Sequence, residues 1–123
     1  MEEIWMKIKL DKTDSKVIHS NEIYDVIDNT NLNNLVVSKT TLHPGKETSG
    51  HNHSGQEEVY IFIRGSGKMV VGTNTYNVKA GDTILIPDGD FHKVWNISEH
   101  DSDFKYPICD LEFICVFDGG RNH

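Results

Sequence analysis

GKETSGHNHSGQEEVYIFIRG, residues 45–65, brings two histidines and two glutamates together just before an apolar, β-rich run. On an extended strand, side chains at positions i and i+2 project from the same face, with α-carbons about 6–7 Å apart. His51 and His53 have this spacing, which suits two imidazoles that hold one ion. Glu58 is an odd number of residues further on, but the intervening Ser-Gly pair is turn chemistry that resets which way the chain faces.

A second segment, GDTILIPDGDFHKVWN at residues 81–96, reads as a hairpin. Pro87 ends its first strand, the following Asp-Gly pair makes the turn, and His92 begins the returning strand. A returning strand can bring His92 beside the first three groups. Imidazoles combined with one carboxylate suit Zn, Mn, Fe, Ni or Co, and are too rich in nitrogen for Mg or Ca.

The two segments read G-x5-H-x-H-x4-E-x6-G and G-x5-P-x-G-x2-H-x3-N, complete and in this order. They resemble the two signature motifs of the cupin superfamily, in the form found in small microbial single-domain cupins. The resemblance implies one cupin domain over residues 1–123, an antiparallel jelly-roll β-barrel of about six to eight strands. It also implies one divalent transition metal ion, bound by His51, His53, Glu58 and His92. Glu57 does not match the ligand position.

The rest of the chain supports an all-β fold, because short apolar runs alternate with turn residues and helical periodicity is hard to find. About eight to ten short strands in so small a chain must close into a sandwich or barrel. A polar loop is expected at residues 98–107. The expected strands are residues 4–10, 23–27, 35–42, 58–64, 68–72, 75–79, 82–87, 92–97 and 111–117.

Length and charge narrow the functional classes. The 123 residues suit a single domain, and the net charge of −7 argues against non-specific nucleic-acid binding. We find neither a signal-peptide pattern nor an apolar run long enough to span a membrane, so we expect a cytoplasmic protein that does not bind membranes. The two cysteines, Cys109 and Cys115, would lie about 20 Å apart on one extended segment, which predicts reduced thiols.

Strict alternation after the turn puts Tyr60 and Arg64 on the Glu58 face, and Thr40 is expected to face inward from an earlier strand. These three are the pocket candidates, although aromatic side chains inside a barrel more often serve as core packing, and no acid–base residue stands out. The opposite face, Val59 to Ile63, is apolar and, with the strand at residues 4–10, predicts a homodimer.

The ligand set would leave coordination positions open for a small-molecule ligand or substrate. We favour a metal-dependent isomerase, epimerase or lyase that uses the ion as a Lewis acid on a small polar or sugar-like substrate. An Fe(II)-dependent dioxygenase is one alternative. A non-catalytic binding or sensor module is the other.

Overall fold

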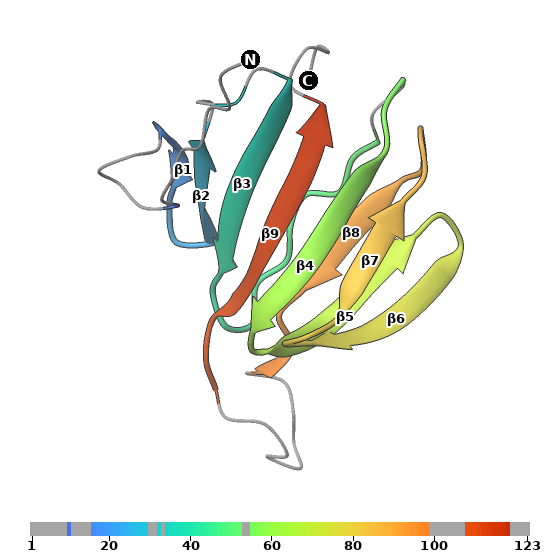
Figure 1. The fold of residues 1–123 in the computed structure, drawn as a ribbon. Coiled ribbons are helices and arrows are strands. Elements are labelled where there is room, and N and C mark those ends of the chain that lie inside the picture. Colours follow the sequence, from blue (N-terminus) through green and yellow to red (C-terminus); the bar gives the residue numbers. More distant parts are fainter. Residues whose placement is uncertain are drawn as a thin grey trace.

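The chain folds into two antiparallel sheets, seen in a computed structural model that describes residues 10, 16–29, 32, 34–52, 55–98 and 108–118. The larger sheet has the strand order β1-β2-β3-β9-β4-β7 and the smaller has the order β6-β5-β8 (Figure 1). The strands are β1 (Lys16–Ser20), β2 (Tyr24–Asn29), β3 (Leu35–Leu42), β4 (Glu58–Arg64), β5 (Ser66–Val71), β6 (Asn74–Lys79), β7 (Thr83–Ile86), β8 (His92–Trp95) and β9 (Leu111–Asp118).

This architecture confirms the predicted all-β, antiparallel jelly-roll barrel. Strands β3 and β4 begin and end at the predicted residues. Strand β1 was not predicted; it is only five residues long and its pairing with β2 has an irregular register. The strand expected at residues 4–10 and the loop expected at 98–107 fall almost entirely outside the described residues.

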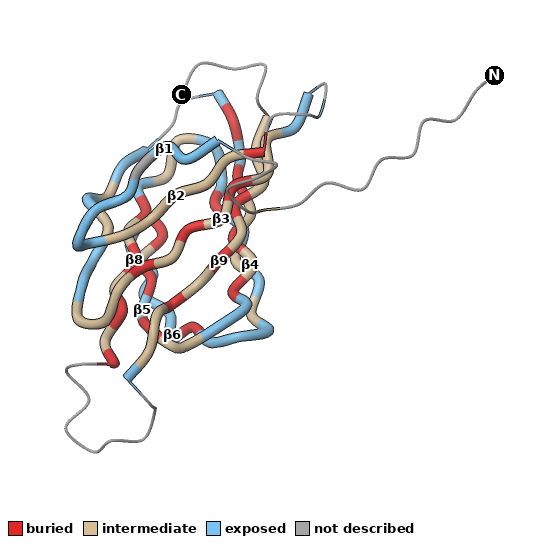
Figure 2. Tube along the Cα trace, turned by 90° about the vertical axis from the view of Figure 1, so that its left-hand side faces the viewer, coloured by how far each residue is buried: buried red, intermediate tan, exposed pale blue. Residues whose placement is uncertain are grey.

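The core lies between the two sheets and is built by alternate residues of the strands. In β9, Leu111, Phe113 and Cys115 are buried while the residues between them are partly exposed. Figure 2 shows the buried positions recurring along the strands. Because side chains alternate across a strand, each of these runs supplies one face to the core. The buried hydrophobic set is Leu42, Tyr60, Phe62, Met69, Val71, Val78, Ile86, Val94, Leu111, Phe113 and Cys115.

Asn96 joins three segments at the end of the barrel where β9 begins. Its amide nitrogen donates hydrogen bonds to the backbone carbonyls of Leu42 (2.9 Å) and Cys109 (2.8 Å). Its amide oxygen accepts hydrogen bonds from the backbone N–H and the hydroxyl of Ser98. Asn96 is 1% exposed, so these bonds satisfy polar groups that have no access to bulk water. Asn96 therefore has a structural role in the barrel.

Gly65, the last position of the first motif, sits where β4 turns into β5. Its φ of +81° lies in the left-handed region, and a Cβ atom here would lie 2.5 Å from the carbonyl oxygen of Asp110. Only glycine therefore fits without moving the segment that leads into β9. Cys109 and Cys115 are both free, as expected. None of the described residues belongs to a helix long and apolar enough to cross a membrane.

Candidate metal site and barrel cavity

Backbone pairing brings the two motifs together. His51 and His92 form an antiparallel bridge, in which the His51 N–H donates to the His92 carbonyl (3.1 Å) and the His92 N–H donates to the His51 carbonyl (2.9 Å). Their rings meet edge to face with centroids 4.4 Å apart. The expected pairing of His92 with the first motif is thus present.

His92 is held in one orientation. Its ring is 2% exposed, and its Nδ1 atom lies 3.1 Å from the backbone carbonyl oxygen of Asp90. A carbonyl only accepts hydrogen bonds, so Nδ1 carries the proton and the lone pair of the neutral ring is on Nε2. That Nε2 atom lies 3.7 Å from Oε2 of Glu58. A backbone partner that fixes the tautomer in this way is typical of histidines that bind metals.

Glu58, the first residue of β4, points inward and is 5% exposed. Burial raises the pKa of its carboxyl group from 4.5 to about 7. A carboxylate oxygen and an imidazole lone pair so close together repel each other unless a proton or a cation lies between them. The chemistry of this pair therefore fits a bound divalent ion.

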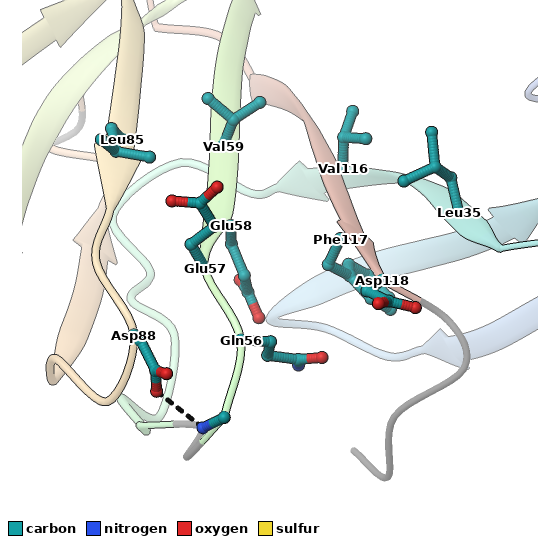
Figure 3. Close-up of a pocket in the computed structure, with 11 residues that line it drawn as sticks. Leu35, Gln56, Glu57, Glu58, Val59, Leu85, Asp88, Val116, Phe117 and Asp118 are labelled. Carbon is teal, nitrogen blue, oxygen red and sulfur yellow. Dashed lines mark hydrogen bonds between the residues drawn. The ribbon is translucent and has the colours of Figure 1, made fainter.

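The two loops that carry the ligand candidates are tied to each other at the barrel mouth. Asp88, in the turn of the second motif, accepts a 2.6 Å hydrogen bond from the backbone N–H of Gly55 (Figure 3). The turn itself closes through a bond from Asp90 N–H to the Pro87 carbonyl, with Gly89 at a φ of +82°. The relative position of Glu58 and His92 is therefore held by loop contacts as well as by the sheets.

His53, the remaining ligand candidate, lies outside the described residues. Among the residues that are described, no three His, Cys, Asp or Glu side chains converge closely enough to hold an ion. The described part contributes two contacts, His51 to His92 and His92 to Glu58. Nitrogen and carboxylate donors of this kind suit a transition metal.

Two of the ligand candidates, His51 and Glu58, border a cavity of about 280 Å³ inside the barrel. Of the three predicted pocket residues, Thr40 and Tyr60 line this cavity, but Arg64 does not. The Arg64 side chain is 55% exposed, and its Nη1 lies 4.0 Å from Oε1 of Glu112. The pairing of β4 with β9 shifts register between Phe62 and Arg64, which ends the alternation that predicted an inward side chain.

Tyr60 supports the site through packing. Its ring stacks on Phe113 with centroids 4.9 Å apart and meets the His92 ring edge-on at 5.6 Å. Burial raises the pKa of the Tyr60 phenol well above its ordinary value, with Cys115 and Glu58 adding to the shift. Burial likewise raises the pKa of the Cys115 thiol. Both groups are therefore protonated at neutral pH and do not act as bases.

Sequence reasoning missed several cavity residues, among them Asp28, Thr48, Ser49 and Cys115. Asp28 is the most informative, because it brings a second carboxylate to a cavity that already holds Glu58. Alternation from Tyr24 through Val26 would have placed Asp28 on the inner face, had the strand been extended past residue 27.

A second cavity, of about 580 Å³, lies at the rim where β4 begins and β9 ends (Figure 3). Glu58 and Phe117 line both cavities and so form the wall between them. Apolar side chains of the outer sheet face make one side of the rim cavity, including Leu35, Val59, Leu85 and Val116. It therefore opens onto the outer face of the large sheet rather than into the barrel.

The fold and the paired motifs define a class, the small antiparallel jelly-roll barrels with histidine and glutamate side chains near the mouth. The model of the cupin domain family, Cupin_2, matches residues 38–106. The chain belongs to this cupin family. The structure of a cupin-2 domain protein from Rhodospirillum rubrum superposes with a TM-score of 0.75 at 14% identity, over 96% of this chain and 78% of that one.

Two curated relatives are similar to part of this chain. Uncharacterized protein MJ1618 of Methanocaldococcus jannaschii is 42% identical over 53 residues, covering 43% of this chain and 42% of that protein. The oxalate-binding protein of Thermotoga maritima is 28% identical over 67 residues, covering 54% of this chain and 55% of that protein. The chain thus spans about half the length of these relatives.

Proposed function

We propose that this cupin binds one divalent transition metal ion (Zn, Mn, Fe, Ni or Co) with His51, His53, Glu58 and His92, and that it acts on a small polar substrate as an isomerase, epimerase or lyase. The observation that carries the proposal is the buried His92 ring, whose Nε2 faces the Glu58 carboxylate 3.7 Å away. When bound, the ion would supply Lewis-acid polarisation of a substrate carbonyl or hydroxyl.

The chain's own groups would bind and orient the substrate. The hydroxyls of Ser38 and Thr40 face the cavity and offer hydrogen bonds, while Phe113 gives an apolar wall. Tyr60 keeps its proton at neutral pH, so it serves as a hydrogen-bond donor and packs against His92. The cavity is at the lower end of the roughly 300–1,000 Å³ usual for ligand sites, which favours a ligand of a few carbon atoms.

Metal analysis tests this proposal directly. The protein, purified without chelators, is expected to hold near-stoichiometric metal, and His51→Ala and His92→Ala should each lose it. His43→Gln is the matched control, because His43 lies outside the site, with its ring nitrogens near Asp110 (3.0 Å) and Asp25 (3.4 Å). Wild-type protein without metal even after reloading would refute the metal site.

The metal's identity would then separate the reaction classes. Zinc, manganese or nickel supports isomerase or lyase chemistry. Iron with oxygen uptake on candidate substrates would favour the Fe(II)-dependent dioxygenase instead. Oxalate belongs on the ligand panel as the dicarboxylate to compare with neutral polar ligands, because a relative carries that name. A ligand that binds tightly and is recovered unchanged would favour the binding or sensor module.

We further propose a homodimer through the outer face of the large sheet. Val59 is paired with Leu85 on one side and with Val116 on the other, and these residues point away from the core. Leu85 is 57% exposed and Ile63 on the same face is 44% exposed, so burying them would be favourable. Light scattering should give twice the chain mass at micromolar concentration, and Leu85→Lys should reduce it. A monomeric wild type would refute the dimer.

A further inference from the structure

Asp28 lies on β2, which β3 and β9 separate from β4 in the large sheet, and it adds a carboxylate to the inner cavity. On β2 it is paired with the inward-facing Ser38 of β3, and it lines the inner cavity. Ser38 is paired in turn with Cys115, and Cys115 with Tyr60. These four residues form one row across neighbouring strands, and all of them line the cavity. Asp28 and Tyr60 are the two ends of this row. Three strand spacings separate them, so their α-carbons are about 14 Å apart.

The Asp28 carboxylate is half-buried, yet within the described part of the chain it makes no hydrogen bond or ion pair. Its cross-strand neighbour on β1, Lys16, is exposed and forms no ion pair with it among these residues. A partly desolvated carboxylate without a protein donor gains free energy when a ligand supplies one. Asp28 therefore offers a carboxylate that no described residue engages, at the end of the cavity away from Glu58.

The rest of the lining favours hydroxyl groups over negative charge. Four side-chain hydroxyls from Ser38, Thr40, Thr48 and Ser49 surround the cavity. Among the described residues that line it there is no lysine or arginine, whereas Asp28 and Glu58 are both acidic. Away from the proposed metal ion, a second negative charge on a ligand would meet Asp28 without a cation to offset it.

We propose that Asp28 sets the ligand class of this site: uncharged, hydroxyl-bearing small molecules are bound and dicarboxylates are rejected. This inference rests on the proposed metal site, which would hold one end of the ligand. Asp28 accepts hydrogen bonds from hydroxyl groups at the other end. A carboxylate acceptor makes a stronger bond to a hydroxyl than an amide does, so it also contributes affinity.

Binding calorimetry on the full chain tests the inference with three small probes, the neutral hydroxyketones dihydroxyacetone and xylulose and the dianion malonate. Wild-type protein should bind the hydroxyketones at least about tenfold more tightly than malonate. Asp28→Asn should weaken the hydroxyketones severalfold and tighten malonate, so that the preference shrinks about tenfold or more. Glu22→Gln removes the same charge from an exposed position outside the cavity and should change neither.

Metal content measured in the same samples separates this inference from the proposed function. If the metal is present and unchanged in Asp28→Asn, but malonate binds wild type as tightly as the hydroxyketones, the inference is overturned while the metal site stands. An unchanged preference in Asp28→Asn overturns it as well, as does metal-loaded wild type that binds neither hydroxyketone. Loss of metal from wild type overturns the proposed function instead.

Discussion

Replacing Glu58 by glutamine should stabilise the metal-free protein at alkaline pH. The carboxyl group has a pKa of about 7 in the folded chain against 4.5 for an ordinary glutamate, a difference of about 2.5 pH units. At roughly 1.36 kcal/mol per unit, the buried charge costs the fold up to about 3 kcal/mol once the group is ionised in both states. Glutamine has nearly the same shape and carries no charge.

The sign follows from the raised pKa. Below pH 4.5 the group is largely protonated in both states and the charge cost is absent; the cost develops between pH 4.5 and 7 and is complete above pH 7. Because the new amide must still find partners, we expect a net gain of about 1–3 kcal/mol at pH 8 and little difference at pH 4. Addition of metal should reverse the order, since a ligand at 1,000 times its Kd stabilises wild type by about 4.1 kcal/mol, more than the expected gain of the variant.

Urea denaturation in a chelator at pH 4 and pH 8 measures these differences. Glu57→Gln is the matched control, because Glu57 is the exposed neighbour and loses the same charge. A Glu58→Gln variant that is less stable than wild type at pH 8 without metal would refute the reasoning. So would a stability difference that stays constant between the two pH values.

Two further predictions concern the frame of the barrel. Asn96→Ala should lower the free energy of unfolding by about 2–4 kcal/mol, because the buried Leu42 carbonyl loses this donor and the Cys109 carbonyl keeps only the longer bond from the Ser98 hydroxyl (3.3 Å). A loss below about 1 kcal/mol in urea denaturation would contradict the stabilising role of these bonds. Gly65→Ala should cost more stability than Gly81→Ala in thermal unfolding. Both glycines have positive φ, but only Gly65 also has a carbonyl oxygen 2.5 Å from the added Cβ. Equal losses would show that the positive φ alone determines the loss of stability, and that the contact with the Asp110 carbonyl does not contribute.

Strand content and the inward positions of Glu58 and His92 were predictable because they rest on local signals. Alternation in β4 and the Asp-Gly turn before β8 each act within a few residues. The approach of His92 to His51 required more, since spacing alone does not show which strands pair. The resemblance to known motifs supplied that step.

Arg64 and Asp28 show where sequence reasoning stopped. Arg64 follows the alternation of β4, but the register shift after Phe62 depends on the partner strand β9 and turns it to solvent. Asp28 precedes a polar stretch and the predicted strand ends at Ile27, whereas pairing with β3 extends β2 to Asn29. In both cases the pairing with a distant strand determines where the side chain points, and local sequence patterns do not predict that pairing.

The hydrogen bonds of Asn96 lie where β9 begins at Leu111, whereas Glu58 is paired with Phe117 near the other end of the same strand. The Asn96 side chain thus joins the segments at one end of the barrel, and the candidate metal ligands lie at the other end. Because these two ends are separate, we expect substitutions around the mouth to leave the Asn96 hydrogen bonds intact, so that the cavity lining can change while the strand register is kept. Such a separation would let one barrel acquire new ligands by changing a few side chains near its mouth.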